Sequence, residues 1–249
     1  MKILLIAALL PLAAAAQTAS QSAPQSVRAV VPVVGSVDGA NEVRWRTALQ
    51  LVNDSRADVT VAVTLMTAPD QPALLTTIGA GDTVSFNDVA TEAFGVESIL
   101  SPLVVETLGR RSVTVRAAAY GVRGDTIFKP EPITVNYGSV WYPIQTLQGL
   151  SFTDALRTNV GLVNLGGQPT TFVVAVRRLP GRNLAVARVP MAPFSMWHVP
   201  IQQLFPMITK GDDFTVVIET TSPDTFVYAS VIENETNNAT FIQPQVGTP

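Results

Sequence analysis

Hydrophobic and polar residues alternate along most of the chain beyond its N-terminal stretch. Alternation with a period of two is typical of β-strands with one buried face, because successive side chains of a strand point to opposite sides of the sheet. The alternation is complete over residues 59–65 and develops towards the end of residues 45–52, and the polar residues 53–56 between them favour a turn. This pair of segments therefore predicts a β-hairpin, and helical turns are expected only at residues 89–94 and 200–205.

The strand pattern of the first half of the chain returns in the second half. The matched segments are residues 30–33 with 141–144 and 45–53 with 156–164, both at an offset of 111 residues, and 85–89 with 195–199 at an offset of 110. Collinear matches of this kind are hard to obtain by chance. The sequence therefore predicts an internal duplication.

Each repeated unit is about 110 residues long, which suits one antiparallel β-sandwich of roughly 100 residues. Much shorter repeats would instead indicate a solenoid or a propeller, whose units cannot bury a core alone. We expect an all-β protein with two tandem immunoglobulin-like antiparallel β-sandwich domains, at residues 28–138 and 139–249, with the boundary at Gly138 and Ser139.

The N-terminus has the pattern of an export signal. Lys2 precedes an apolar run over residues 3–12, and four alanines follow at 13–16. This order is typical of a secretory signal peptide, and the run is shorter than the ~20 residues that span a bilayer. We expect a signal peptide at residues 1–16 and a polar linker at 17–27, with no membrane span after cleavage. Because the chain has no cysteine, which is uncommon for small secreted eukaryotic domains, we expect a secreted or periplasmic bacterial protein.

Composition and charge exclude several classes of function. The 249 residues are 47% hydrophobic and 14% charged, which argues against disorder and long solvated helices. Sixteen basic and nineteen acidic residues give a net charge of −3 and no indication of a nucleic-acid surface. The absence of cysteine excludes thiolate chemistry, and a single histidine excludes multi-histidine metal sites. We therefore expect no metal and no cofactor.

An arginine occurs at the same place in both units, as Arg46 and Arg157. The structural interpretation is a guanidinium whose stem packs over an aromatic residue such as Trp45 and whose head lies on a carboxylate or a loop carbonyl. The functional alternative is a clamp for an anion or a carboxylate. We favour the structural interpretation, with the matched acids Glu106 and Glu219 as candidate salt-bridge partners.

His198 is the one candidate general base, and no serine motif such as Gly-x-Ser-x-Gly stands near it. A lone histidine beside Trp197 is more typical of a hydrogen-bonded structural residue. We predict no catalytic residue and no enzyme activity. A structure that placed His198 with Ser195 and an acid in one cleft, or two acids together, would favour an enzyme.

Aromatic residues are candidates for stacking on sugars. Trp45, Trp141, Tyr142 and Trp197 are the relevant side chains, although residues of predicted strands are by default buried. The candidate binding residues are thus the two matched arginines, Arg46 and Arg157, and two of these aromatic residues, Trp141 and Trp197.

Two motifs in the first unit carry a resemblance to a known group. A Gly-Ala-Asn turn at residues 39–41 precedes the strand at residues 45–53, and a short Asp-containing turn follows at residues 87–89. The chain resembles the immunoglobulin-like repeat modules of secreted, largely uncharacterised proteins of environmental bacteria. The resemblance covers residues 30–243, and the second unit departs from it at residues 150–152 and 198–199. It implies an exported scaffold or adhesion-type domain without assigned catalysis.

We expect an exported, non-enzymatic structural or interaction protein of the cell envelope, which serves display, adhesion or binding of a protein partner or an extracellular polymer. Sheet edges or loop clusters would provide the contact. A carbohydrate-binding module is the alternative. A second alternative is a periplasmic chaperone-like subunit binder, since the size and the leader resemble those of pilus chaperones, with Arg28 and Lys129 in the places of their carboxylate anchors. Those chaperones have two dissimilar domains, whereas these two units align.

Overall fold

The computed structural model describes residues 27–67, 70–138, 142–178 and 182–246. The expected signal peptide, most of the linker, Ser139 and Trp141 lie outside the described residues. Within them the chain is built almost entirely of antiparallel strands, so the all-β class is confirmed. Residues 59–65 form one strand and residues 89–94 form a helix, as the sequence predicts. The expected β-hairpin of residues 45–52 with 59–65 is wrong, because these two strands belong to different sheets and are not paired with each other.

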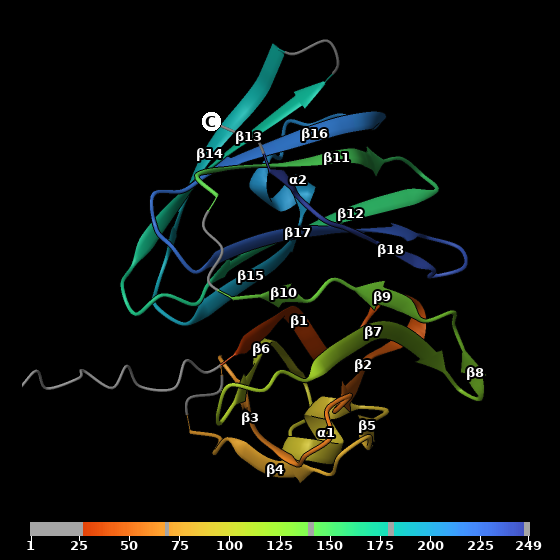
Figure 1. Cartoon of the computed structure of the whole chain (residues 1–249). Coiled ribbons are helices and arrows are strands. Elements are labelled where there is room, and N and C mark those ends of the chain that lie inside the picture. The colour runs from red at the N-terminus through yellow and green to blue at the C-terminus, as the bar shows by residue number, and fades with distance from the viewer. Residues whose placement is uncertain (1–26, 68–69, 139–141, 179–181, 247–249) are drawn as a thin grey trace, which may run out of the picture.

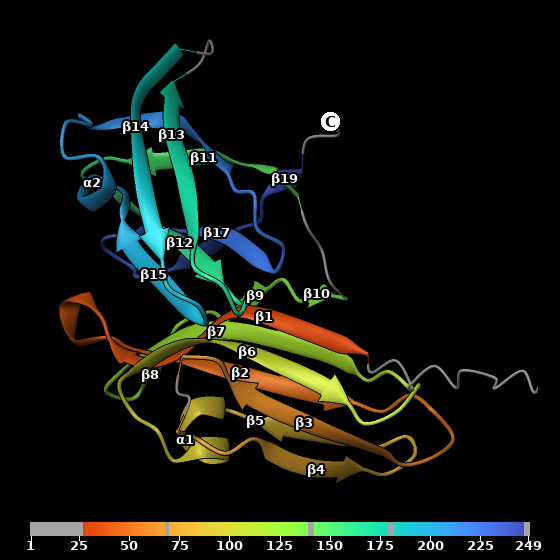
Figure 2. The same cartoon turned by 90° about the vertical axis from the view of Figure 1, so that its left-hand side faces the viewer.

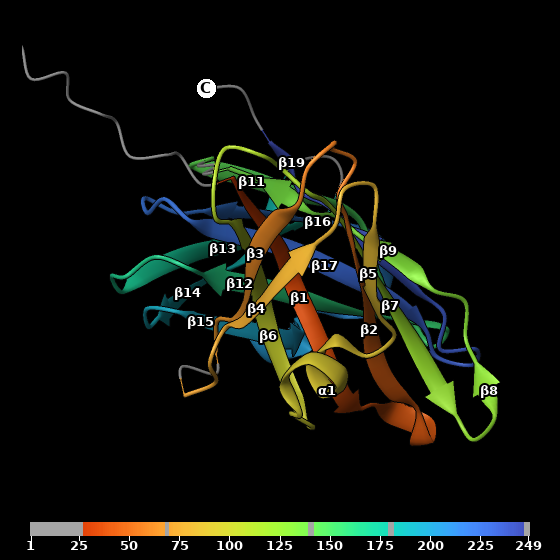
Figure 3. The ribbon, with the colours of Figure 1, turned by 60° about the horizontal axis from the view of Figure 1, so that its bottom comes forward.

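The first half forms two connected sheets. Its elements are β1 (Arg28–Asp38), the 3-10 turn η1 (Ala40–Glu42), β2 (Arg44–Val52), β3 (Val59–Leu65), β4 (Leu74–Ile78), β5 (Thr83–Phe86), α1 (Val89–Phe94), β6 (Ile99–Thr107), β7 (Thr114–Arg123), β8 (Thr126–Ile127), β9 (Glu131–Ile133) and β10 (Asn136–Tyr137). Sheet 1a has the strand order β4-β3-β6-β1-β10, and sheet 1b has the order β5-β2-β7-β9, with β8 also on β7. The end of β1 pairs with β2 and joins the two sheets, and α1 packs against β1 and β2 (Figure 3).

The second half contains β11 (Ile144–Phe152), β12 (Leu156–Asn164), β13 (Thr170–Arg178), β14 (Arg182–Met191), β15 (Ser195–Pro200), α2 (Ile201–Leu204), β16 (Gly211–Glu219), β17 (Thr225–Glu233), β18 (Ala239–Ile242) and β19 (Gln245–Val246). Sheet 2a has the order β14-β13-β16-β11-β19, and sheet 2b has the order β15-β12-β17-β18. Strand for strand, these are the orders of sheets 1a and 1b.

Hydrogen bonds of two matched threonines show how the halves correspond. The Thr47 hydroxyl bonds the backbone of Gly35, and the Thr158 hydroxyl bonds the backbone of Ser151. The threonines are 111 residues apart, but Gly35 and Ser151 are 116 apart. The expected match of residues 30–33 with 141–144 is therefore wrong. The mismatch arises because the connection between β1 and β2 contains η1 and is longer than the connection between β11 and β12, which is a short turn.

The expected match of residues 85–89 with 195–199 is also out of register. His198 pairs with Gly161, while the residue that corresponds to Gly161 at an offset of 111, Gln50, pairs with Ser85. His198 therefore takes the place of Ser85, and the shared serine that suggested the match lies three residues away. Two identities in five residues, Ser85 with Ser195 and Val89 with Val199, are not enough to set the register of a short strand.

Each half buries its own apolar core between its two sheets. A third apolar cluster joins the halves, with Val30 and Val104 from sheet 1a and Val163, Phe226 and Tyr228 among its members from sheet 2b. These residues alternate with core residues along their strands, so they lie on the outer faces of their sheets. The outer face of sheet 2b is thus packed on the first half, as Figures 1 and 2 show.

Polar contacts between described residues also cross between the halves. Arg28 Nη1 lies 3.1 Å from Asp224 Oδ1. The Phe241 N–H donates to Glu131 Oε1 at 3.3 Å, and Asn41 Nδ2 donates to the Asn234 carbonyl at 3.2 Å. They fix the relative placement of the halves at separate points along the interface.

Candidate functional site

A cleft of about 260 Å³ lies between the two halves. Residues of β1, β2, β6, β7 and β9 form one wall, and residues of β12, β15, β17 and β18 form the other. The cleft forms where the outer face of sheet 2b covers the first half without filling all the space beside it. Neither half alone contains both walls.

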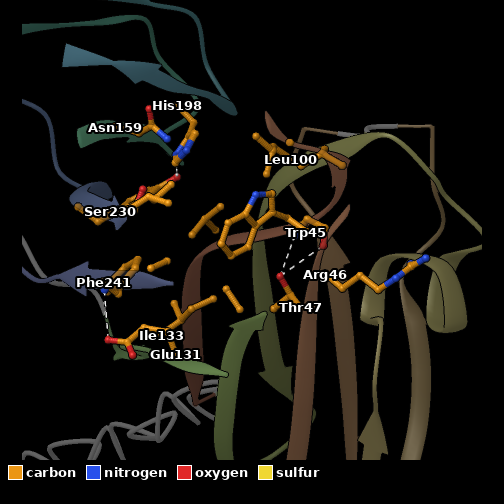
Figure 4. Close-up of a pocket in the computed structure, with 18 of the residues that line it drawn as sticks. Trp45, Arg46, Thr47, Leu100, Glu131, Ile133, Asn159, His198, Ser230 and Phe241 are labelled. Carbon is orange, nitrogen blue, oxygen red and sulfur yellow. Dashed lines mark hydrogen bonds between the residues drawn. The ribbon is translucent and has the colours of Figure 1, made fainter. Parts of the chain in front are cut away.

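Trp45 is the largest side chain of the wall from the first half (Figure 4). On β2 it shares a face with Thr47, and its half-buried indole extends towards the second half. A Cβ at Gly39 would lie 2.5 Å from Trp45 Nε1, so the glycine leaves the room that the ring occupies. Leu100 and Ile133 continue the apolar lining.

Polar side chains gather on the opposite wall, where Arg157, Asn159 and Ser230 line the cleft. Asn159 and Ser230 are directly paired across β12 and β17, and Arg157 lies two residues from Asn159 on the same face of β12. The Ser230 hydroxyl is buried and has no hydrogen-bond partner among the described residues. This end of the cleft therefore offers hydrogen-bonding groups beside an apolar wall.

Arg157 is held by two asparagines from the turn between β17 and β18. Nη1 donates to Asn234 Oδ1 at 2.8 Å and Nη2 donates to Asn237 Oδ1 at 3.2 Å. Within the described parts of the chain, no carboxylate lies within 4.0 Å of this guanidinium. Burial lowers the pKa of the Arg157 guanidinium below its ordinary value. The expected partner Glu219 is wrong, since that side chain is exposed on β16.

Arg46 has a different environment. Its Nη1 is paired with the buried carboxylate of Asp88 and bonds the Ser36 hydroxyl at 3.3 Å. Asp88 also caps α1 by accepting the Thr91 N–H. The guanidinium therefore lies on a carboxylate, which is the arrangement that the sequence favoured, but the partner is not Glu106, whose side chain is exposed on β6. Arg46 borders the cleft, and its guanidinium points away from it (Figure 4).

His198 lines the cleft and is hydrogen-bonded to Tyr228, with 2.9 Å between Nδ1 and the hydroxyl. Burial lowers the pKa of His198 to about 4 and raises that of the Tyr228 hydroxyl. The Ser195 hydroxyl instead donates to the Ala192 carbonyl at 2.6 Å. His198 and Ser195 are thus engaged separately, and the described contacts of His198 are those of a structural residue.

Of the two tryptophans proposed for sugar binding, Trp197 is the one that the structure describes. Trp141 falls outside the described residues. Trp197, on β15, is 42% exposed and is not among the residues that line the cleft. Of the two tryptophans that the structure describes, Trp45 contributes to the cleft.

Asn159 and Ser230 were not among the sequence candidates. The signal that could have found them is the difference between the two units: at the corresponding places of the first unit, Ala48 and Ala118 are paired with each other. A polar pair that replaces an alanine pair on a sheet face marks a change of role for that face.

Arg28 and Lys129, which would anchor a carboxylate in the chaperone-like alternative, are not arranged for that role. Arg28 is paired with Asp224 across the interface, so its guanidinium already has a carboxylate. Lys129 is exposed and follows β8, outside any strand. A free terminal carboxylate would find no arranged pair of cations here.

The described residues contain neither a cluster of metal-binding side chains nor a helix that could cross a membrane. No group of three or more His, Asp or Glu side chains among them could hold a metal ion. The helices that the structure describes are too short and insufficiently apolar to cross a membrane.

Comparisons of the chain with protein-family models, with curated proteins and with solved structures found no match in any of the three. Function is therefore inferred from the geometry of the chain alone.

Proposed function

We propose that the protein is an exported, non-enzymatic binding protein of the bacterial cell envelope, secreted or periplasmic, which holds a small ligand between two immunoglobulin-like sandwiches. The observation that carries this proposal is the cleft of about 260 Å³, whose lining combines apolar side chains such as Trp45 and Ile133 with hydrogen-bonding side chains such as Asn159. Ligand sites commonly lie between domains and combine apolar lining with a small number of polar groups.

The common strand order of the two halves supports the domain part of the proposal. Two tandem sandwiches that arose by duplication would present equivalent outer faces. The face of sheet 2b, however, carries Gly161 and Tyr228, whereas the exposed face of sheet 1b carries Gln50 and Arg116 at the corresponding places. The second copy has thus acquired the residues that dock it on the first and leave a cleft.

The chemistry of the lining supports holding a ligand without converting it. Arg157, Asn159 and Ser230 can donate or accept hydrogen bonds. The histidine of the cleft is bonded to Tyr228, which burial keeps protonated. A general base would need a partner whose proton it could take.

Blocking the cleft tests this function. Saturation-transfer NMR with a set of small neutral and charged aromatic molecules should give binders of the wild-type chain. Ser230→Phe fills the cleft and should remove them, while Ser85→Phe, on the exposed face of β5, should leave them unchanged. Circular dichroism establishes that both variants fold. Binding that survives in folded Ser230→Phe, or the absence of any binder, would contradict the proposal.

A second candidate, a carbohydrate-binding module, is favoured by one observation: Trp197 is 42% exposed on β15, which is the edge strand of sheet 2b. An exposed indole face can stack on a sugar ring. A glycan array tests it, since binding that disappears in folded Trp197→Ala would support the carbohydrate function. An array without signal for the wild-type chain would eliminate it.

A further inference from the structure

We propose that the ligand of the cleft is a small monocarboxylate with an apolar, ring-sized body, and that Arg157 binds its carboxylate. This inference rests on the proposed function and names the class of ligand. It goes beyond that function because it assigns one charged residue as the anchor and one sign of charge to the ligand.

The first argument is the charge of Arg157. Arg28 and Arg46, which also lie at or beside the interface, are each paired with a carboxylate. Arg157 has only the amide oxygens of Asn234 and Asn237. A partly buried cation without an anion is costly, and an anionic ligand would offset that cost.

The second argument is geometry. A guanidinium has five N–H donors, and two are used by the asparagines. The Asn234 amide is oriented by its own bond from Nδ2 to the Asp154 carbonyl, at 2.9 Å. Asn237 is fully buried, and its backbone N–H donates to the Glu233 carbonyl at 2.9 Å. The guanidinium is thus held in place, and a planar, fixed fork of donors matches a carboxylate.

The third argument is the surroundings of the guanidinium. Asn159 lies on the same wall, paired with Ser230, and its side-chain amide can bond a second oxygen of the ligand. Trp45 and Ile133 provide the apolar surface opposite. The volume corresponds to roughly nine water molecules at about 30 Å³ each, which suits a single ring with a short chain.

The fourth argument concerns the number of negative charges on the ligand, and it favours one over two. Glu131 also lines the cleft, and its carboxylate accepts the Phe241 N–H. Among the described residues, no cation lies within 4.0 Å of Glu131. A second anionic group on the ligand would be repelled there, so dicarboxylates are disfavoured.

Calorimetry of the full chain at pH 7.5 tests the inference with a matched pair of probes, 3-phenylpropionate and its neutral amide. We expect the acid to bind the wild-type chain at least tenfold more tightly than the amide. Arg157→Gln should abolish this preference, and Arg157→Lys, which keeps the charge but not the fork, should keep part of it. Arg116→Gln, on the exposed face of sheet 1b, is the control and should match the wild type.

The outcomes separate this inference from the function on which it rests. Equal binding of acid and amide, both lost in Ser230→Phe, would overturn the carboxylate anchor and leave the binding function standing. Binding of neither probe, together with no binder in the wider set of molecules, would overturn both. If Arg157→Gln does not fold, Ser230→Asp decides the question, because a carboxylate built into the same wall should remove the preference for the acid. A preference that survives there contradicts the inference.

Discussion

The Tyr228 hydroxyl lies 2.9 Å from Nδ1 of His198, and the two rings stack with their centroids 5.7 Å apart. The residue between them in the sheet is Gly161, which pairs with His198 on one side and with Tyr228 on the other. The tyrosine ring lies over the glycine and also stacks on Phe241, with 5.1 Å between the centroids. The missing side chain at Gly161 thus allows the contact that builds one wall of the cleft.

A side chain at Gly161 should disrupt this wall. In Gly161→Ala the new Cβ would overlap the Tyr228 ring, so the ring must move out of its stack. Because overpacking of a buried contact costs about 1–3 kcal/mol, we expect Gly161→Ala to lower the free energy of unfolding by about 2 kcal/mol. Urea titration followed by circular dichroism measures it. Gly167→Ala, whose Cβ meets only Phe194 Cζ at 3.8 Å, should be nearly neutral.

Stability should fall in mild acid because of His198. Burial lowers its folded-state pKa from 6.5 to about 4, so between these values the unfolded chain binds a proton that the folded chain does not. The contribution is fully present above pH 6.5 and is lost as the pH falls towards 4, at up to about 1.4 kcal/mol per pH unit. Urea titrations from pH 7.5 to 4 should show this slope in the wild type and a smaller one in His198→Gln. Equal slopes would mean that His198 titrates normally in the folded protein.

The pair of Arg46 and Asp88 should be a major contributor to the stability of the first half. Removing Arg46 leaves a buried carboxylate without its cation, and breaking a buried pair in this way costs about 3–5 kcal/mol. We expect Arg46→Met to cost about 3 kcal/mol in a urea titration. Lys210→Met breaks the exposed pair with Asp154, which should cost less than about 1 kcal/mol. If the two variants lose the same stability, Asp88 does not depend on Arg46.

Phe226 should hold the two halves together. It is buried in the cluster between the halves, while the corresponding residue of the first unit, Thr114, lies outside any such cluster. Phe226→Thr should remove about 3 kcal/mol of docking free energy and split a single thermal transition into two. The core variant Phe172→Leu should lower the stability without splitting the transition. One transition in folded Phe226→Thr would show that the halves do not depend on this contact.

Single local elements could be predicted from the sequence, whereas the pairing of residues 45–52 with 59–65 as a hairpin was wrong. Alternation located β3 at residues 59–65, and the mixed segment at residues 89–94 located α1. A turn was expected at residues 53–56, and Asn53 accepts the Ser55 N–H there, as the matched Asn164 accepts the Gly166 N–H. These features depend on neighbours in the chain, which is why one sequence is enough to find them.

Long-range features could not be predicted in the same way. Asp88, the partner of Arg46, was identified from the sequence only as part of a turn motif. Its contact with Arg46 depends on α1, the helix that it caps, which packs against the strand of Arg46. Arg157 was singled out, but its setting comes from Asn234 and Asn237, about 80 residues away. Alternation shows that a strand has two faces, and it does not show that the other half of the chain covers the outer one.

The most direct test of the cleft is NMR of the ¹⁵N-labelled full chain titrated with 3-phenylpropionate. The two walls belong to different halves, so a ligand between them must affect both. We expect the indole N–H of Trp45 and the backbone N–H groups of Asn159 and Ser230 to shift together along one binding curve. Shifts confined to one half, or no shift at any of the three groups at millimolar ligand, would contradict a binding site between the two halves.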